Sequence, residues 1–115
     1  MPTTDILDVK VKLLRGFADR TRLGILNALQ EKEMTVGELV ARIGGGQSNI
    51  SQHLACLRGC GVINKRQEGK YCYYALAGDR IGELLAMVDS IMVDIRQDVA
   101  CCGLNDRLLP PAGGE

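Results

Sequence analysis

The most distinctive chemistry in this sequence lies in its five cysteines. Cys56 and Cys60 stand four residues apart in the segment HLACLRGCG, and Cys101 and Cys102 adjoin each other near the C-terminal end. On a helix, side chains four positions apart have Cβ atoms about 5 to 6 Å from one another, so two such thiolates can bind one soft metal ion. The same pair could instead form a redox couple or fill the core, since cysteine is often buried. The spacing alone leaves these three interpretations open.

The rest of the composition narrows the chemistry. His53 is the only histidine, so neither a Cys2His2 site nor an all-histidine site can form within one chain. The sequence has no phosphate-binding glycine loop, dinucleotide motif or nucleophile elbow, which argues against an enzyme and an organic cofactor. It also has neither the layout of a signal peptide nor an apolar run long enough to span a bilayer. We therefore expect a cytoplasmic protein with reduced thiols and no membrane contact.

Four helices are predicted in the first half of the chain. Residues 5–17 and 21–30 each carry an apolar stripe at helical spacing. In TVGELVARIG, Thr35 and Glu38 have the spacing of a capping box, and Gly44 is a helix end. The glycines at 44–46 form a turn, after which a helix from Gln47 to about Cys60 is predicted. Two short helices joined by such a turn are typical of a helix-turn-helix.

The second half changes its pattern twice. The segment VINKRQEGKYCYYAL predicts a β-hairpin with Gln67, Glu68 and Gly69 in the turn and Cys72 packing in the second strand. Residues 79–99 then predict a long helix that is apolar over much of its circumference. The predicted fold class is therefore mainly α with a β-hairpin wing: a winged helix-turn-helix of four helices, a hairpin and a fifth helix.

The helix that begins at Gln47 has one apolar and one polar side. Ile50, Leu54 and Leu57 are expected to face the core, and Gln52 lies opposite, where a polar side chain can reach base edges in a DNA major groove. The net charge of the chain is zero, but residues 47–72 carry four basic side chains against one acidic side chain. They could contact phosphates, although a solvated hairpin with ordinary surface charge fits the same pattern. The predicted DNA-binding residues are Gln47, Ser48, Asn49, Ser51, Gln52, His53, Arg58, Lys65, Arg66 and Lys70.

The motifs FADRTRLGILNAL, VGELVARIGGGQSNISQHLACLRGCGVI and RQEGKYCYYAL resemble, in order and spacing, the ArsR/SmtB family of winged-helix metalloregulators over about residues 10 to 100. Three positions depart from the family pattern: Arg20 replaces a usual proline, and Gly45 and Gly46 replace a leucine and a Ser or Thr. Gly46 should therefore be a weaker N-cap. The resemblance implies a homodimer through the first and last helices, which binds an operator that is an imperfect palindrome.

Within that family, HLACLRGCG is most similar to the cadmium- and lead-responsive CmtR-type repressors. This resemblance implies that Cys56 and Cys60 of one protomer bind the ion with Cys101 of the other, with Cys102 as a possible further ligand. The domain organisation would then be residues 1–100 for DNA binding and dimerisation. Residues 101–115 would be a tail that holds the metal-ligand cysteine and is disordered past residue 109.

Thiolate ligands select soft ions, so the expected effector is Cd(II) or Pb(II), with As(III) or Hg(II) as alternatives. The binding of the ion is expected to release the repressor from its operator. Two other functions fit the same residues. The cysteines could form a redox or persulfide switch on a DNA-binding protein, or the domain could be a protein-interaction module with structural cysteines.

Overall fold

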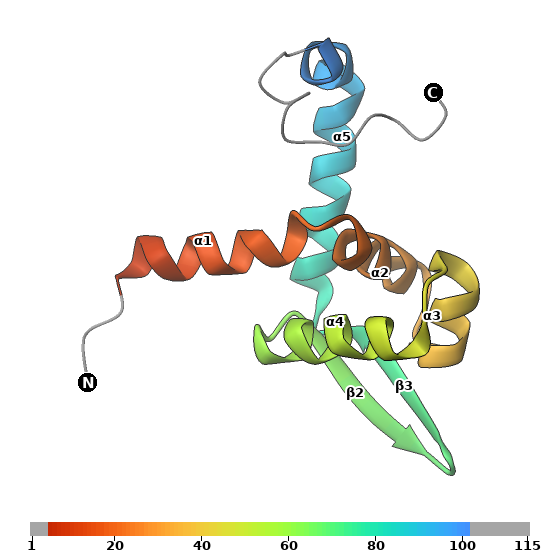
Figure 1. The fold of residues 1–115 in the computed structure, drawn as a ribbon. Helices are drawn as coiled ribbons and strands as arrows, with labels where there is room; N and C mark the ends of the chain where they lie inside the picture. The colour runs from red at the N-terminus through yellow and green to blue at the C-terminus, as the bar shows by residue number, and fades with distance from the viewer. Residues whose placement is uncertain (1–4, 102–115) are drawn as a thin grey trace. The chain divides into compact units, whose positions relative to one another are not determined.

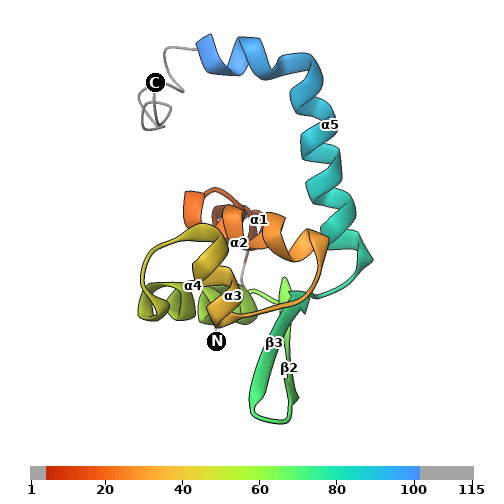
Figure 2. The ribbon, with the colours of Figure 1, turned by 90° about the vertical axis from the view of Figure 1, so that its right-hand side faces the viewer.

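The computed structural model describes residues 5–101, with the side chains of residues 96–101 excepted. Its helices and hairpin follow the predicted order (Figures 1 and 2). One additional short strand precedes the third helix. They are α1 (Ile6–Phe17), α2 (Arg20–Glu31), β1 (Met34–Thr35), α3 (Val36–Ile43), α4 (Gln47–Gly59), β2 (Ile63–Glu68), β3 (Tyr71–Leu76) and α5 (Asp79–Cys101).

Side-chain caps fix the starts of three helices. The carboxylates of Asp5 and Asp19 accept backbone N–H groups at the starts of α1 and α2. At α3 the predicted capping box is present: the Glu38 N–H donates to Thr35 Oγ1 at 3.1 Å, and the Thr35 N–H donates to Glu38 Oε1 at 2.9 Å. Gly44 ends α3 with a φ of 93°, and Gly46 precedes α4 without any side-chain cap, as the sequence predicted.

Replacing Thr35 with alanine should lower the free energy of unfolding by about 1 kcal/mol, because one N–H of the first turn of α3 loses its acceptor. Urea denaturation at one fixed protein concentration measures this change. Thr35→Ser keeps the acceptor and should remain close to the parent protein. Equal losses in both variants would indicate that the methyl group of Thr35, not its cap, stabilises the fold.

The core forms where α2, α3 and α4 meet. Ile25 and Leu26 from α2, Leu39 from α3, and Leu54 and Leu57 from α4 are at most 1% exposed. Ile50 of α4 is also fully buried, so the predicted apolar side of this helix is confirmed. Burying a Leu or Ile side chain is worth about 1.5 to 3 kcal/mol. This apolar side therefore fixes which side of α4 faces outward.

The strands form a small antiparallel sheet in the order β1-β3-β2. β1 was not predicted; it pairs Met34 with Tyr74 and Thr35 with Tyr73. The prediction of Gln67 and Glu68 in the hairpin turn was wrong, because both remain in β2. Pairing continues to Glu68 opposite Tyr71, so the turn contains only Gly69 and Lys70, with Gly69 at a φ of 61°. Glycine adopts a positive φ without steric cost, which permits this tight turn.

The chain divides into two compact units, residues 1–82 and 83–115. α5 begins at Asp79 as predicted and extends to Cys101, two residues beyond its predicted end. No helix among residues 5–101 combines the length and apolar character needed to cross a membrane. The predicted tail, including the disorder past residue 109, lies outside the described residues except for Cys101, whose backbone ends α5.

Candidate nucleic-acid interface and thiol site

The outward side of α4 carries polar side chains. Gln47, Ser48, Asn49, Ser51, Gln52 and Arg58 are all exposed, and His53 is half-buried. The buried residues of α4 hold this polar surface in place, and the glycines at 44 and 45 connect it to α3 with positive φ values. A rigid helix with short polar side chains on its exposed face can present hydrogen-bonding groups to a DNA groove.

The hairpin β2–β3 carries the other predicted DNA-binding residues. Lys65, Arg66 and Lys70 are exposed, and the Lys70 ammonium lies 5.8 Å from the centre of the Tyr71 ring. Tyr71 itself is 54% exposed, so the end of the hairpin presents an aromatic ring together with positive charge. Such a surface can contact a phosphate backbone.

Arg66 differs from the two lysines because its guanidinium is already paired. It forms ion pairs with Glu33, which precedes β1, and with Glu68 of its own strand, and it lies over the Tyr73 ring at 4.9 Å. The hydrogen bond from Arg66 lowers the pKa of Glu33, and the two carboxylates raise the pKa of Arg66. No sequence signal indicated this pairing, because Glu33 and Arg66 are 33 positions apart.

Cys56 lies in the last turn of α4, and Cys60 is the residue that caps the end of this helix. The Cys60 N–H donates to the Cys56 carbonyl oxygen at 3.1 Å, so the two residues are one helical turn apart. Cys56 is exposed and Cys60 is half-buried. An exposed thiol contributes little to a core, so the structure disfavours the interpretation of Cys56 as core filler. Cys72 is half-buried in β3, in agreement with its predicted packing role.

An arginine from α2 contacts the first of these thiols. Arg22 Nη1 donates to Cys56 Sγ at 3.5 Å, and Arg22 Nη2 donates to the Arg15 carbonyl oxygen at 3.4 Å. The Nε atom of Arg22 is buried and has no hydrogen-bond partner among the described residues. The sequence did not indicate this contact, because the two residues are 34 positions apart.

Asp19 lies on the other side of Arg22. Its carboxylate accepts the Arg22 backbone N–H at 3.0 Å, and this hydrogen bond is the largest cause of the lowered pKa of Asp19. The nearby Arg22 guanidinium and His53 imidazole lower the pKa of Asp19 further. The start of α2 and the middle of α4 therefore bring together a carboxylate, a guanidinium, an imidazole and a thiol.

The described residues supply only part of a metal site. They contain no group of three or more His, Cys, Asp or Glu side chains arranged to hold a metal ion. Of the other predicted ligands, Cys101 ends α5 with its side chain undescribed, and Cys102 lies outside the described residues. Two soft donors on one turn of helix fit a thiophilic ion, and a complete site would need at least one further ligand.

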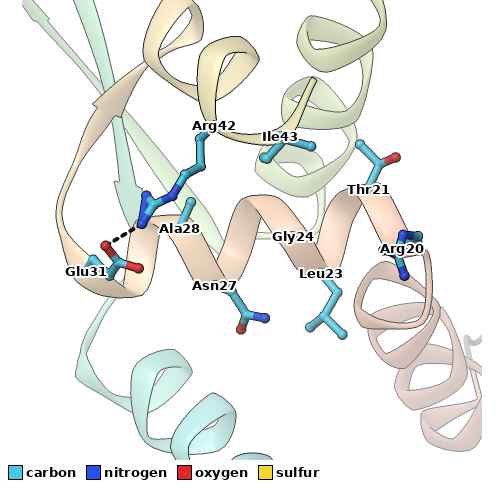
Figure 3. Close-up of a pocket in the computed structure, with 9 residues that line it drawn as sticks. All are labelled: Arg20, Thr21, Leu23, Gly24, Asn27, Ala28, Glu31, Arg42 and Ile43. Atoms are coloured by element: carbon cyan, nitrogen blue, oxygen red, sulfur yellow. Dashed lines mark hydrogen bonds and ion pairs between the residues drawn. The ribbon is translucent and has the colours of Figure 1, made fainter. Parts of the chain in front are cut away.

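A groove of about 530 Å³ lies along α2 beside the end of α3, away from these residues (Figure 3). The Glu31–Arg42 ion pair, at 2.5 Å, spans one end of it. None of the predicted thiol or DNA-binding residues lines the groove; its lining consists of Arg20, Thr21, Leu23, Gly24, Asn27, Ala28, Glu31, Arg42 and Ile43.

Comparison with known proteins assigns this helical arrangement to a family. The family model for bacterial regulatory proteins of the arsR family matches residues 19–65. The HTH-type transcriptional regulator CmtR of Mycobacterium tuberculosis (strain ATCC 25618 / H37Rv) is 38% identical over 90 residues, which are 78% of this chain and 76% of that protein. The chain belongs to the ArsR family.

Other relatives of this ArsR-family protein agree with that assignment. The probable mercury resistance operon repressor of Streptomyces lividans is 32% identical over 95 residues, covering 83% of this chain and 76% of that one. The crystal structure of M. tuberculosis Rv0081 has a TM-score of 0.78 at 31% identity and covers 86% of this chain and 100% of its own. The NMR structure of the cadmium metal-sensor CMTR from M. tuberculosis has a TM-score of 0.60 at 42% identity, over 67% of this chain and 79% of that one.

These similarities confirm several predictions from the sequence. The chain is an ArsR-family transcriptional regulator with a winged helix-turn-helix fold, in which α3 and α4 form the helix-turn-helix and β2–β3 the wing. It is not an enzyme, since its relatives are regulators that bind DNA. The resemblance to the CmtR type is also confirmed.

Proposed function

We propose that this protein is a dimeric transcriptional repressor that leaves its operator when Cd(II) or Pb(II) binds cysteine thiolates. The observation that carries this proposal is the position of Cys56 and Cys60. The exposed and the half-buried thiol lie one turn apart at the end of α4, the same helix whose outward side presents Ser51 and Gln52. A ligand bound to these thiols acts directly on the helix that reads the DNA.

The proposed ligands are Cys56, Cys60 and Cys101, with Cys102 as a possible replacement or fourth sulfur. Three thiolates select soft ions over hard ions such as Mg²⁺, and they suit Cd(II) and Pb(II). Two relatives support a soft-metal effector: one is named a cadmium metal-sensor and the other a probable mercury resistance operon repressor. When bound, the ion supplies a cross-link between the end of α4 and the C-terminal region of a chain.

The proposed dimer interface uses α1 and α5. Both helices expose large apolar side chains in the single chain: Ile6 is 69% exposed and Leu7 63% in α1, and Met87 is 58% and Val93 83% in α5. Monomeric proteins seldom leave such surfaces in water, and a second copy of the chain would cover them. A two-fold dimer presents two copies of α4, which suits an imperfect palindrome. The proposed location is the cytoplasm, where thiols stay reduced and the operator is accessible.

In the proposed complex, polar side chains of α4 face the base edges, and Arg58, Lys65 and Lys70 contact phosphates. The residues that face the bases are Gln47, Ser48, Asn49, Ser51, Gln52 and His53. Arg66 positions the wing, since its guanidinium already pairs with Glu33 and Glu68. Metal binding favours a dimer shape in which the two α4 helices no longer match the operator. A coupling free energy of about 1 to 3 kcal/mol changes the operator affinity by about 5- to 150-fold.

The test is an ultraviolet titration of the reduced, full-length protein with Cd(II), with fluorescence anisotropy of a labelled operator in the same samples. The operator is first selected from random duplexes. We expect a sulfur-to-metal charge-transfer band that saturates as the DNA is released and that weakens in Cys101→Ser but not in Cys102→Ser. A missing band, or DNA that stays bound while the site fills, would refute the metal switch and make a thiol oxidant the next inducer to try.

A further inference from the structure

The strongest unexplained feature beside the proposed metal site is the guanidinium of Arg22. One of its nitrogens donates to Cys56 Sγ at 3.5 Å, a second donates to a backbone carbonyl at 3.4 Å, and the third is buried without a hydrogen-bond partner among the described residues. The contact with the carbonyl oxygen is long, because N–H···O hydrogen bonds are usually about 2.7 to 3.2 Å. A positive charge is thus held against the thiol with its hydrogen-bonding capacity only partly used.

The charge of the occupied site depends on the ion. A divalent ion bound by three thiolates carries a net charge of −1, since three thiols lose three protons to solvent and the ion contributes +2. Arsenous acid instead condenses with three thiols, releasing three waters, and the resulting As(III) site is neutral. With three thiolates, the divalent site is therefore one unit more negative than the arsenic site. A neighbouring cation therefore favours the divalent ion, because outer groups around metal ligands tune the site.

We propose that Arg22 is a specificity-determining residue that favours divalent soft ions over As(III) at the Cys56 site. This inference rests on the proposed function, because it requires that Cys56 is a metal ligand. Arg22 does not bind the ion itself. It lies on α2, donates to the ligand sulfur, and offsets the excess negative charge that only the divalent complex acquires.

Asp19 permits a second test of the charge argument, because it places a negative charge beside Arg22 and its neutralisation should have the opposite effect to the loss of Arg22. Its carboxylate lies close enough to Arg22 for the guanidinium to lower the pKa of Asp19. The negative charge of Asp19 partly cancels the positive charge of Arg22. Removing the Asp19 charge should therefore favour binding of the divalent ion further. Asn at an N-cap is as good as Asp, so Asp19→Asn removes the charge and keeps the cap of α2.

The experiment measures the affinities of the full-length reduced protein for Cd(II) and for arsenite, each by its sulfur-to-metal absorption, in the parent and in Arg22→Gln, Arg22→Lys and Asp19→Asn. In Arg22→Gln we expect the Cd(II) affinity to fall by about 10- to 100-fold, the range found for groups that support metal ligands, and the arsenite affinity by less than about 3-fold. Arg22→Lys keeps the positive charge, so it should retain most of the parent's preference for Cd(II) over arsenite. Asp19→Asn should raise the ratio of Cd(II) to arsenite affinity by about 2- to 5-fold.

Arg20→Gln is the matched control, because it removes an exposed arginine from the same helix and should leave the ratio unchanged. Equal weakening of both ions in Arg22→Gln, or an unchanged ratio in Asp19→Asn, would overturn the role of Arg22 and leave the metal switch intact. Absence of thiolate-bound Cd(II) in the parent protein would instead refute the proposed function. If Arg22→Gln does not fold, as judged by its thermal transition, the lysine and asparagine variants still decide the question.

Discussion

The double substitution Cys56→Ser and Cys60→Ser should give a protein that binds its operator but no longer releases it when Cd(II) is added. Serine oxygens are harder, weaker donors for soft ions, so the charge-transfer band should disappear and the metal affinity should fall by at least about 100-fold. Operator affinity without metal should stay within about 3-fold of the parent, because an exposed and a half-buried residue contribute little to the core. Ultraviolet titration and operator anisotropy measure the two properties separately.

Cys72→Ser is the control for this substitution. Its thiol lies in β3 and is half-buried, as Cys60 is, but it belongs to the wing and not to α4. The control should keep both the absorption band and the metal-induced release of DNA. A double variant that still releases DNA with Cd(II) would place the sensing site elsewhere and would contradict the assignment of Cys56 and Cys60. Loss of operator binding before metal is added would instead indicate that the cysteines support the structure of α4.

The parts of the fold that could be predicted from sequence are those whose causes are local. Thr35 and Glu38 are three positions apart, and their capping box depends only on the first turn of α3. The buried side of α4 follows from the helical spacing of Ile50, Leu54 and Leu57. The same helical spacing predicted that Gln52 lies on the opposite side of α4, where it is exposed. Local spacing therefore determined both the core of the reading helix and its outward surface.

The features that were missed depend on residues far apart in the chain. β1 contains only Met34 and Thr35, too few residues to show any alternation, and it exists because β3 pairs with it. The contact of Arg22 with Cys56 joins two helices and has no spacing signature. The third proposed ligand, Cys101, also lies far from Cys56 in the chain, and only the family resemblance predicted it.

Two substitutions on different elements should separate the reading of bases from the binding of phosphates. Gln52→Ala should reduce the preference for the selected operator over random duplex, because an amide side chain that reaches a base edge contributes about 1 to 3 kcal/mol of discrimination. Lys65→Ala should weaken binding to both duplexes alike and reduce the slope of log affinity against log salt by about 1, because the protein then neutralises one phosphate fewer. Fluorescence anisotropy at several salt concentrations measures both effects. Equal weakening of specific and random binding in Gln52→Ala would show that α4 does not read bases through this residue.

Arg66→Ala provides the internal comparison, because Arg66 and Lys65 are adjacent and carry the same charge. The Arg66 guanidinium pairs with Glu33 and Glu68, so its charge is already balanced before DNA arrives, whereas no ion pair of Lys65 is found among the described residues. A cation that is not already paired neutralises a DNA phosphate and releases the counterions condensed there. The slope of log affinity against log salt should therefore change less in Arg66→Ala than in Lys65→Ala. Equal changes would mean that Arg66 leaves its carboxylates to bind phosphate, and that the wing rearranges on the operator.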